Sequence, residues 1–241
     1  MKTKKDEFWA VIPARSGSKS LKHKNIKFFL KRPLMVHSII SAKKNKLIKK
    51  IIFSSDSKKY ISIARKYKCD FYNKRSRKNS GDLSTDYDVF KEIITYLKKN
   101  KINLPKFFVH FRPTCPLRKN KTISKAIQTF KKNQNYYSSL KSISFNSHNS
   151  LKDFKIKNKK LFSINIKNQF NIDNVNIPKE KLEKTYVGNG VIDIYKTKNI
   201  LKGKLLGNKV FPLITEEIFC DIDSEKDFKI GQILATKLHK D

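Results

Sequence analysis

Short apolar segments alternate with amphipathic segments along most of the chain. Compact apolar runs predict strands, and they lie at residues 8–12, 51–54, 70–72, 107–111 and 137–143. Apolar residues spaced three and four apart predict helices, which we expect at residues 33–46, 57–67, 86–99 and 122–132. Strands that alternate with helices form βαβ units, so we expect an α/β fold with a doubly wound, mainly parallel sheet. Such sheets bind ligands at the carboxyl ends of their strands.

The pattern changes between residues 146 and 185. This segment is polar, rich in Asn and Lys, and weakly periodic. We therefore expect a single domain over residues 1–241, with 146–185 inserted as an extended β arm. Regular structure is expected to resume after the arm, with strands at 188–195, 210–214 and 219–222 and a helix at 224–238.

The formal net charge of +35 would suggest a nucleic-acid-binding protein if it were concentrated. However, seven of the 55 basic residues are arginines, and the lysines are spread from Lys2 to Lys240. A nucleic-acid-binding protein more often gathers its cations on one face and uses arginine to bind phosphates and bases. Nucleic acid is therefore disfavoured as a partner, whereas an anionic substrate would be attracted at low salt.

The cysteines and the apolar runs indicate a location. Cys69, Cys115 and Cys220 are far apart and lack the spacing of a zinc site, which favours a reduced, cytoplasmic protein. No apolar run approaches the roughly 20 residues of a membrane span. The first residues, MKTKKDEFW, lack the apolar core of a signal peptide. We expect a cytoplasmic protein that does not enter the membrane.

The first candidate site follows the first strand, in the segment IPARSGSKSLKHKN at residues 12–25. Small residues allow backbone N–H groups to approach phosphate oxygens, and Arg15, Lys19, Lys22 and Lys24 supply positive charge. The segment matches neither a Walker loop nor a GxGxxG fingerprint. Without further signals, a solvated basic loop remains an alternative.

Further motifs follow in order along the chain. They are Ser54-Ser55-Asp56, Arg75 with Asp82, RPTCPLR at 112–118, Asn189-Gly190 and Asp221-Ile222-Asp223. Together with residues 12–25, this series resembles the CMP-sialic acid synthetases (acylneuraminate cytidylyltransferases), over residues 8 to about 230. The resemblance implies a Rossmann-like nucleotidyltransferase that transfers CMP from CTP to the anomeric hydroxyl of a nonulosonic, sialic-type acid with nine carbons.

The resemblance also implies roles for individual residues. Arg15 and Lys24 would hold the triphosphate, Asn25 and Arg75 would contact the cytidine, and Asp221 and Asp223 would bind Mg²⁺. Carboxylates at i and i+2 of a strand point to the same side and can share a hard cation. The implied catalytic residues are Arg15, Lys24, Asp221 and Asp223; the nucleotide-binding residues are Ala14, Arg15, Ser16, Gly17, Ser18, Lys24, Asn25, Arg75 and Asp82; and the substrate-binding residues are Arg112, Thr114 and Asn189. The family likeness further implies a homodimer in which the arm reaches the neighbouring active site.

Several residues depart from the family pattern. Ser20 replaces a glycine, Asp86 stands where relatives have a serine near the base, and Arg112 replaces a glutamine. An arginine at 112 could bind a substrate carboxylate through two hydrogen bonds. His110 is expected to be packed rather than catalytic. The alternatives are a ketodeoxyoctonate-using or GTP-using enzyme of the same fold, a nucleic-acid-binding protein, and a non-catalytic relative.

Overall fold

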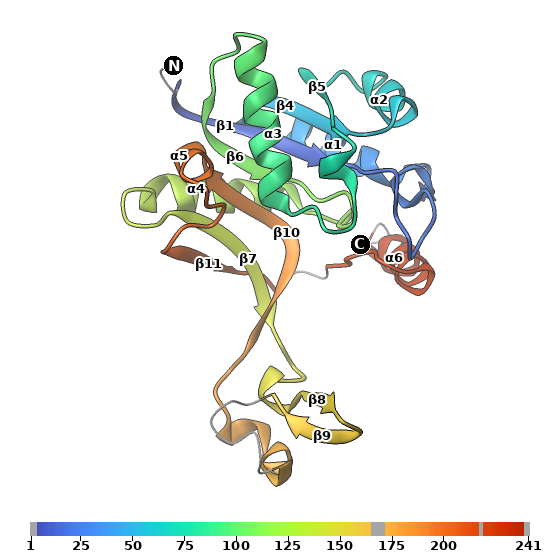
Figure 1. The fold of residues 1–241 in the computed structure, drawn as a ribbon, viewed down its shortest axis with the longest axis vertical. Helices are drawn as coiled ribbons and strands as arrows, with labels where there is room; N and C mark the ends of the chain where they lie inside the picture. Colours follow the sequence, from blue (N-terminus) through green and yellow to red (C-terminus); the bar gives the residue numbers. More distant parts are fainter. Residues whose placement is uncertain (1–3, 165–171, 217–218, 239–241) are drawn as a thin grey trace. The chain divides into compact units, whose positions relative to one another are not determined.

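A computed structural model describes residues 4–164, 172–216 and 219–238. A seven-stranded sheet in the order β11-β7-β10-β6-β1-β4-β5 forms its centre (Figure 1). Its strands are β1 (Lys4–Pro13), β4 (Ile48–Ser55), β5 (Phe71–Lys74), β6 (Pro105–His110), β7 (Ser139–Phe145), β10 (Tyr186–Lys196) and β11 (Val210–Ile214). Two short strands, β2 (Phe28–Phe29) and β3 (Arg32–Pro33), form a separate hairpin.

The centre of the sheet is parallel. β1 pairs in parallel with β4 on one side and β6 on the other, and β4 pairs in parallel with β5. β10 is antiparallel to β6, and this register sets Asp193 opposite His110. The expected mainly parallel, doubly wound sheet is thus confirmed, and the carboxyl ends of β1, β4 and β6 meet at one edge.

Helices cover both faces of the sheet because successive strand residues point to opposite sides. In β1, Ala10 and Ile12 pack in the core that includes α1 (Leu34–Lys44), α2 (Lys58–Arg65) and α4 (Asn120–Asn133). Trp9 and Val11 pack on the other side with α3 (Asp86–Lys99) and α5 (Thr197–Leu201). Figure 1 shows α3 crossing in front of the sheet. Burial on both faces explains why β1 is encoded as a continuous apolar run.

Two helices start at capping residues that also shape the candidate site. Ser57 caps α2, because its side chain accepts from the Tyr60 backbone N–H. Thr85 and Asp88 form a reciprocal capping box that starts α3 at Asp86. Ser57 follows the carboxyl end of β4 closely, and Thr85 ends the longer segment between β5 and α3.

One expected element is wrong. A strand was predicted at residues 219–222, but these residues form no strand. They are irregular chain that leads into α6 (Glu225–Leu238). Cys220 and Ile222 are buried against Phe29 and Phe228, so their apolar side chains serve the packing of α6 instead. The alternation of buried and exposed residues at 220–223 therefore results from packing against α6 and not from a strand.

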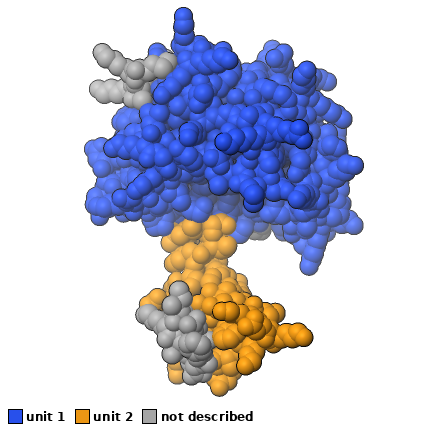
Figure 2. All heavy atoms as spheres, in the orientation of Figure 1, with its two compact units in different colours: residues 1–142, 189–213, 217–241 blue, residues 143–188, 214–216 orange. Residues whose placement is uncertain are grey.

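The chain divides into two compact units (Figure 2). Unit 1 comprises residues 1–142, 189–213 and 217–241, and contains the helices and most of the sheet; unit 2 comprises residues 143–188 and 214–216. Unit 2 includes the antiparallel hairpin of β8 (Phe154–Lys157) and β9 (Lys160–Ser163) and short 3-10 turns. Residues 165–171 of the expected arm lie outside the described ranges.

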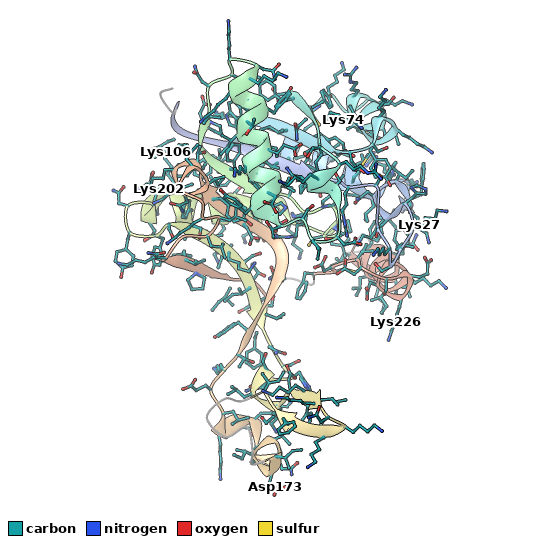
Figure 3. The ribbon with its side chains drawn as sticks, viewed as in Figure 1. Lys27, Lys74, Lys106, Asp173, Lys202 and Lys226 are labelled. Carbon is teal, nitrogen blue, oxygen red and sulfur yellow. The ribbon has the colours of Figure 1, made fainter. Side chains whose placement is uncertain are left out.

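The lysines project from many elements of unit 1 and do not gather on one of them. Figure 3 labels Lys74 on β5, Lys106 on β6 and Lys226 on α6 among them. This distribution agrees with the spread of lysines in the sequence. Within the described ranges, none of the helices combines the length and hydropathy needed to cross a bilayer.

Candidate active site

A cavity of about 420 Å³ lies in unit 1 at the carboxyl ends of β1 and β6. It is bordered by the loop after β1, the segment between β5 and α3, the turn after β6, and the chain before α6. Its lining includes nine of the predicted site residues, namely Arg15, Ser18, Lys24, Asn25, Arg75, Asp82, Arg112, Thr114 and Asp223. Residues up to 208 positions apart in the sequence therefore meet where a doubly wound fold binds ligands.

The first loop is anchored to the end of β4. The Ser16 backbone N–H and hydroxyl donate to the two carboxylate oxygens of Asp56, at 2.8 and 2.6 Å. Burial opposes ionisation of Asp56, but these hydrogen bonds hold the pKa of its carboxyl below the ordinary value. Ala14 is fully buried, and its N–H donates to the carbonyl of Ser54. Ala14, Ser16 and Gly17 thus shape the loop and do not line the cavity.

Lys24 and Asn25 are buried at the inner side of this loop. The Lys24 Nζ donates to Asp223 Oδ1 at 2.8 Å, and the Asn25 amide donates to the carbonyl of Arg15 at 2.8 Å. The Asn25 Oδ1 is buried with no hydrogen-bond partner among the described residues. A buried, unpaired acceptor is costly, so this oxygen is suited to a donor on a ligand.

Asp82 lies between two cations of the first loop. Its carboxylate accepts from Arg15 at 2.8 Å and pairs with Lys19 at 2.6 Å. Hydrogen bonds from Lys19 and then Arg15 lower the pKa of Asp82. Asp82 was expected among the nucleotide-binding residues. Because a carboxylate repels phosphate, its observed contacts favour a role in which Asp82 holds the two cations of the loop in position. Direct contact with a nucleotide remains a prediction.

Arg75 is a buried cation on the wall of the cavity. It donates to the hydroxyl and the carbonyl of Ser54, at 3.4 and 3.2 Å. In the described part of the chain it forms no salt bridge. Burial lowers the pKa of Arg75, and the carboxylates of Asp56, Glu92 and Asp86 offset this effect only from beyond salt-bridge distance. A ligand oxygen in direct contact would stabilise the buried charge further.

Arg112 is held between two carboxylates at the floor of the cavity. Its guanidinium lies 2.7 Å from Asp86 Oδ2 and 2.6 Å from Asp193 Oδ2. Although burial opposes the charge, Asp193 foremost raises the pKa of Arg112. Arg112 was expected to bind a substrate carboxylate, and such a group would have to compete with both partners. That role remains a prediction.

His110 lies beside this ion pair network and is packed, as expected. It is 1% exposed, contacts the ring of Phe90 edge-on at 5.2 Å, and lies 3.3 Å from the hydroxyl of Tyr195. Burial, with Arg112 nearby, lowers the pKa of His110 to about 3. The imidazole is therefore neutral at neutral pH.

Sequence reasoning missed three members of the network, Asp193, Tyr195 and Arg118. Arg118 is buried and donates to the carbonyls of Arg112 at 2.5 Å and Gly190 at 3.3 Å and to the Ser38 hydroxyl at 3.0 Å. It also donates to the carbonyl of Val191. Arg118 joins the turn after β6 to β10, and its signal was its place at the end of the RPTCPLR motif. Asp193 had no local signal.

Thr114 and Asn189 differ in their access to the cavity. Thr114 lines it, and the carbonyl of Thr114 accepts from the Ile222 N–H at 2.8 Å. Asn189 is fully buried outside the lining, and its Oδ1 accepts from the Val191 N–H at 3.2 Å. Its expected contact with substrate remains a prediction. Gly190 has a φ of 65°, which glycine adopts without strain.

Asp221 and Asp223 flank the buried Ile222 and are both exposed. They were expected to point to the same side of a strand, but they do not lie in a strand, so this expectation is wrong. Both side chains nevertheless remain outside the core, because the buried residue lies between them. Asp223 lines the cavity, whereas Asp221 lies beside Gly190 and outside the lining. Among the described residues, no group of three or more His, Cys, Asp or Glu forms a metal site. Two carboxylates still suit Mg²⁺, which takes one or two together with water and phosphate oxygens.

A larger cavity of about 1090 Å³ lies elsewhere in unit 1, between α1, α6 and the β2–β3 hairpin. Its lining contains no carboxylate and, apart from residues 116–118, none of the motif residues. It therefore offers no carboxylate as a metal ligand or general base. The smaller cavity, which nine of the predicted site residues line, is the candidate active site.

Comparison with known proteins identifies related sequences. The sequence model of the family described as Cytidylyltransferase matches residues 9–201. The chain is 28% identical over 232 residues to the post-translational flagellin modification protein B of Campylobacter coli, a match that covers 95% of this chain and 94% of that protein. It is 36% identical over 126 residues to the CMP-N,N'-diacetyllegionaminic acid synthase of Legionella pneumophila, covering 51% and 52% of the two chains.

A solved structure titled as CMP:2-keto-3-deoxy-manno-octonic acid synthetase complexed with CTP has the same fold. The TM-score is 0.67 at 12% sequence identity, with 96% of this chain and 99% of that chain covered. This likeness extends to the fold alone, whereas the family match covers most of the sequence and includes all the residues that line the cavity except Asp223. The protein belongs to the cytidylyltransferase family and is a nucleotidyltransferase.

Proposed function

We propose that the protein transfers CMP from CTP to the anomeric hydroxyl of a nonulosonic, sialic-type acid and releases pyrophosphate. The observation that carries the proposal is the convergence of Arg15, Lys24 and Arg75 on one cavity at the carboxyl ends of parallel strands. A triphosphate requires such a set of cations. The family membership and the likeness to the CMP-N,N'-diacetyllegionaminic acid synthase of Legionella pneumophila support a sugar acid as the acceptor.

The proposed reaction is an in-line displacement at the α-phosphorus. The anomeric hydroxyl oxygen forms a bond to this phosphorus and releases its proton to solvent water, while the bond to the bridging oxygen breaks and pyrophosphate leaves. Lys24 and Arg15 would hold the triphosphate in line, and Asn25 and Arg75 would orient the cytidine. Positioning and neutralisation of charge then account for most of the rate enhancement.

The proposal includes Mg²⁺ at Asp221 and Asp223. The ion would neutralise charge on the phosphate oxygens and on the departing pyrophosphate. Lys24 already occupies Asp223 Oδ1, so these two residues would rearrange around a bound nucleotide. The exposure of both carboxylates is compatible with this change.

A homodimer formed through the arm at 146–185 is also part of the proposal. Unit 2 exposes several apolar side chains, and exposed apolar clusters mark interaction surfaces. They include Phe145, Phe154, Ile156, Leu161, Ile164, Tyr186 and Val187. Sedimentation of the full chain tests the dimer, and a monomer at micromolar concentration would contradict it.

A cytoplasmic location is also part of the proposal, and it is supported by the three free cysteines.

The main experiment measures pyrophosphate release with Mg²⁺ and each of the four nucleoside triphosphates. The acceptors are N-acetylneuraminic, legionaminic, pseudaminic and ketodeoxyoctonic acids. We expect turnover with CTP and a nine-carbon acid, and loss of turnover in Asp221→Ala. Turnover with ketodeoxyoctonic acid alone, or with GTP, would replace the proposed substrate within the same fold, and no turnover with any pair would contradict the activity.

A further inference from the structure

His110 is a buried residue in the lining of the cavity. Its Nε2 is buried with no hydrogen-bond partner among the described residues. The other ring nitrogen, Nδ1, lies 3.3 Å from the hydroxyl of Tyr195. An orphaned polar atom in the lining of a binding cavity calls for an explanation, because leaving it unpaired is costly.

The contacts of Tyr195 determine which nitrogen of His110 carries the proton. The Tyr195 hydroxyl lies 3.1 Å from Asp193 Oδ2, and an ionised carboxylate only accepts. The single hydroxyl hydrogen is thus donated to Asp193, and the hydroxyl oxygen accepts from His110. Nδ1 is therefore protonated, and Nε2 presents a lone pair.

The carboxylate of Asp86 supports the same assignment. Its Oδ2 lies 3.8 Å from His110 Nδ1, which favours a proton on that nitrogen. The lowered pKa of His110, about 3, keeps the ring from taking a second proton near neutral pH. His110 is consequently a neutral hydrogen-bond acceptor, fixed in one tautomer by Tyr195 and Asp193.

This part of the cavity differs from the loop that would hold phosphate. Val89 contributes an apolar wall, while Asp86 and His110 contribute acceptors. Such a surface accommodates a flat, uncharged ring that carries a hydrogen-bond donor. The 4-amino group of cytosine is a donor, whereas the 4-oxo group of uracil is an acceptor and would face the lone pair of Nε2. A carboxylate of the sugar acid would meet the same repulsion.

We propose that His110 selects cytosine over uracil by accepting a hydrogen bond from the 4-amino group of the base through Nε2. Tyr195 is then a positioning residue, because it fixes the tautomer without contacting the nucleotide. The inference rests on the proposed function and adds the residue that distinguishes CTP from UTP.

Equilibrium binding of CTP and UTP with Mg²⁺, measured by calorimetry, tests the proposal on the full chain. The wild type is expected to prefer CTP, and His110→Leu is expected to reduce the CTP-to-UTP preference by about tenfold or more. Tyr195→Phe keeps the imidazole but frees its tautomer, so a smaller reduction is expected. His37→Leu is a matched control, because His37 lies outside this cavity.

The outcomes separate the inference from the proposed function. An unchanged CTP-to-UTP preference in folded His110→Leu would overturn the inference and leave the proposed function intact. A raised KM for the sugar acid with unchanged nucleotide binding would also overturn it and place His110 against the acceptor. Binding of neither nucleotide by the wild type would contradict both. If His110→Leu does not fold by circular dichroism, Tyr195→Phe decides, and an unchanged preference there overturns the inference.

Discussion

The Nζ of Lys24 lies 2.8 Å from Oδ1 of Asp223, so the loop after β1 is joined to the chain before α6. The Lys24 side chain is 9% exposed, whereas that of Asp223 is 71% exposed. A pair with one solvated partner contributes little to stability. A phosphate can therefore replace the carboxylate at Lys24 with little loss of folding free energy.

Replacement of Lys24 by Met should impair turnover and leave the fold intact. The variant keeps the length of the apolar stem but removes the charge that would face the triphosphate. We expect kcat/KM for CTP to fall by about 100-fold or more, as for other groups that stabilise developing charge. Pyrophosphate release measures the loss. Lys22→Met is the matched control, because Lys22 lies in the same loop and is exposed; equal losses in the two variants would contradict a specific role for Lys24.

Replacement of Arg118 by Met should instead destabilise the fold. The change leaves three backbone carbonyls and the Ser38 hydroxyl without the donor that joins the turn after β6 to β10. The carbonyl of Arg112 still accepts from the Cys115 N–H and the Ser38 hydroxyl, so the loss falls mainly on the carbonyls of Gly190 and Val191. A buried acceptor left unsatisfied costs about 1–3 kcal/mol, so we expect the free energy of unfolding to fall by about 2 kcal/mol or more. Urea denaturation followed by circular dichroism provides the measurement.

The neighbouring residue provides the control for Arg118. Lys119 is exposed and precedes α4 without capping it through its side chain. Lys119→Met should change the free energy of unfolding by less than about 0.5 kcal/mol. If Arg118→Met were as stable as Lys119→Met, the hydrogen bonds of Arg118 would not be needed to hold the turn.

The sheet could be predicted from the sequence because its central strands are buried on both faces. The apolar run at 8–12 encodes β1 directly, since helices cover it on either side. The segment at 219–222 is also largely apolar, but its buried residues Cys220 and Ile222 pack against Phe29 and Phe228 of other elements instead of forming a strand. Local pattern alone does not reveal which partner receives a buried side chain.

The candidate site could be predicted where short motifs hold its residues together. The loop at 12–25 and the turn at 112–118 are such motifs, and both reach the cavity. The contact of Arg112 with Asp193 spans 81 positions and depends on the antiparallel register of β10 against β6. This contact could be found only from the structure, because the sequence around either residue does not indicate the other as its partner.

The three cysteines should be unreactive in the folded protein. Cys69, Cys115 and Cys220 are free and buried. Burial raises the pKa of Cys69 to about 12 and that of Cys220 to about 11, and the thiolate is the reactive form. At pH 8 we expect an aromatic disulfide reagent to label no thiol of the native protein within minutes, and all three in guanidinium chloride. Rapid labelling of the native protein would contradict the burial of the thiol concerned.

The pH dependence of stability should carry the signature of His110. Its pKa is about 3 in the folded protein and about 6.5 in an unfolded chain, so below pH 6.5 the unfolded state binds a proton that the folded state does not. Stability should therefore decrease as the pH falls from 6.5 towards 4, by up to about 1.4 kcal/mol per pH unit from this group. Asp86 and Asp193, whose pKa values are lowered, add to the loss only near and below pH 4. Urea denaturation at several pH values measures this dependence. The free energy of unfolding of His110→Leu should decline less steeply with falling pH than that of the wild type. His148→Gln is the control, because the His148 side chain is 72% exposed in the wild type, and its decline should match that of the wild type. An equally steep decline in His110→Leu would mean that His110 is not the group held neutral by burial.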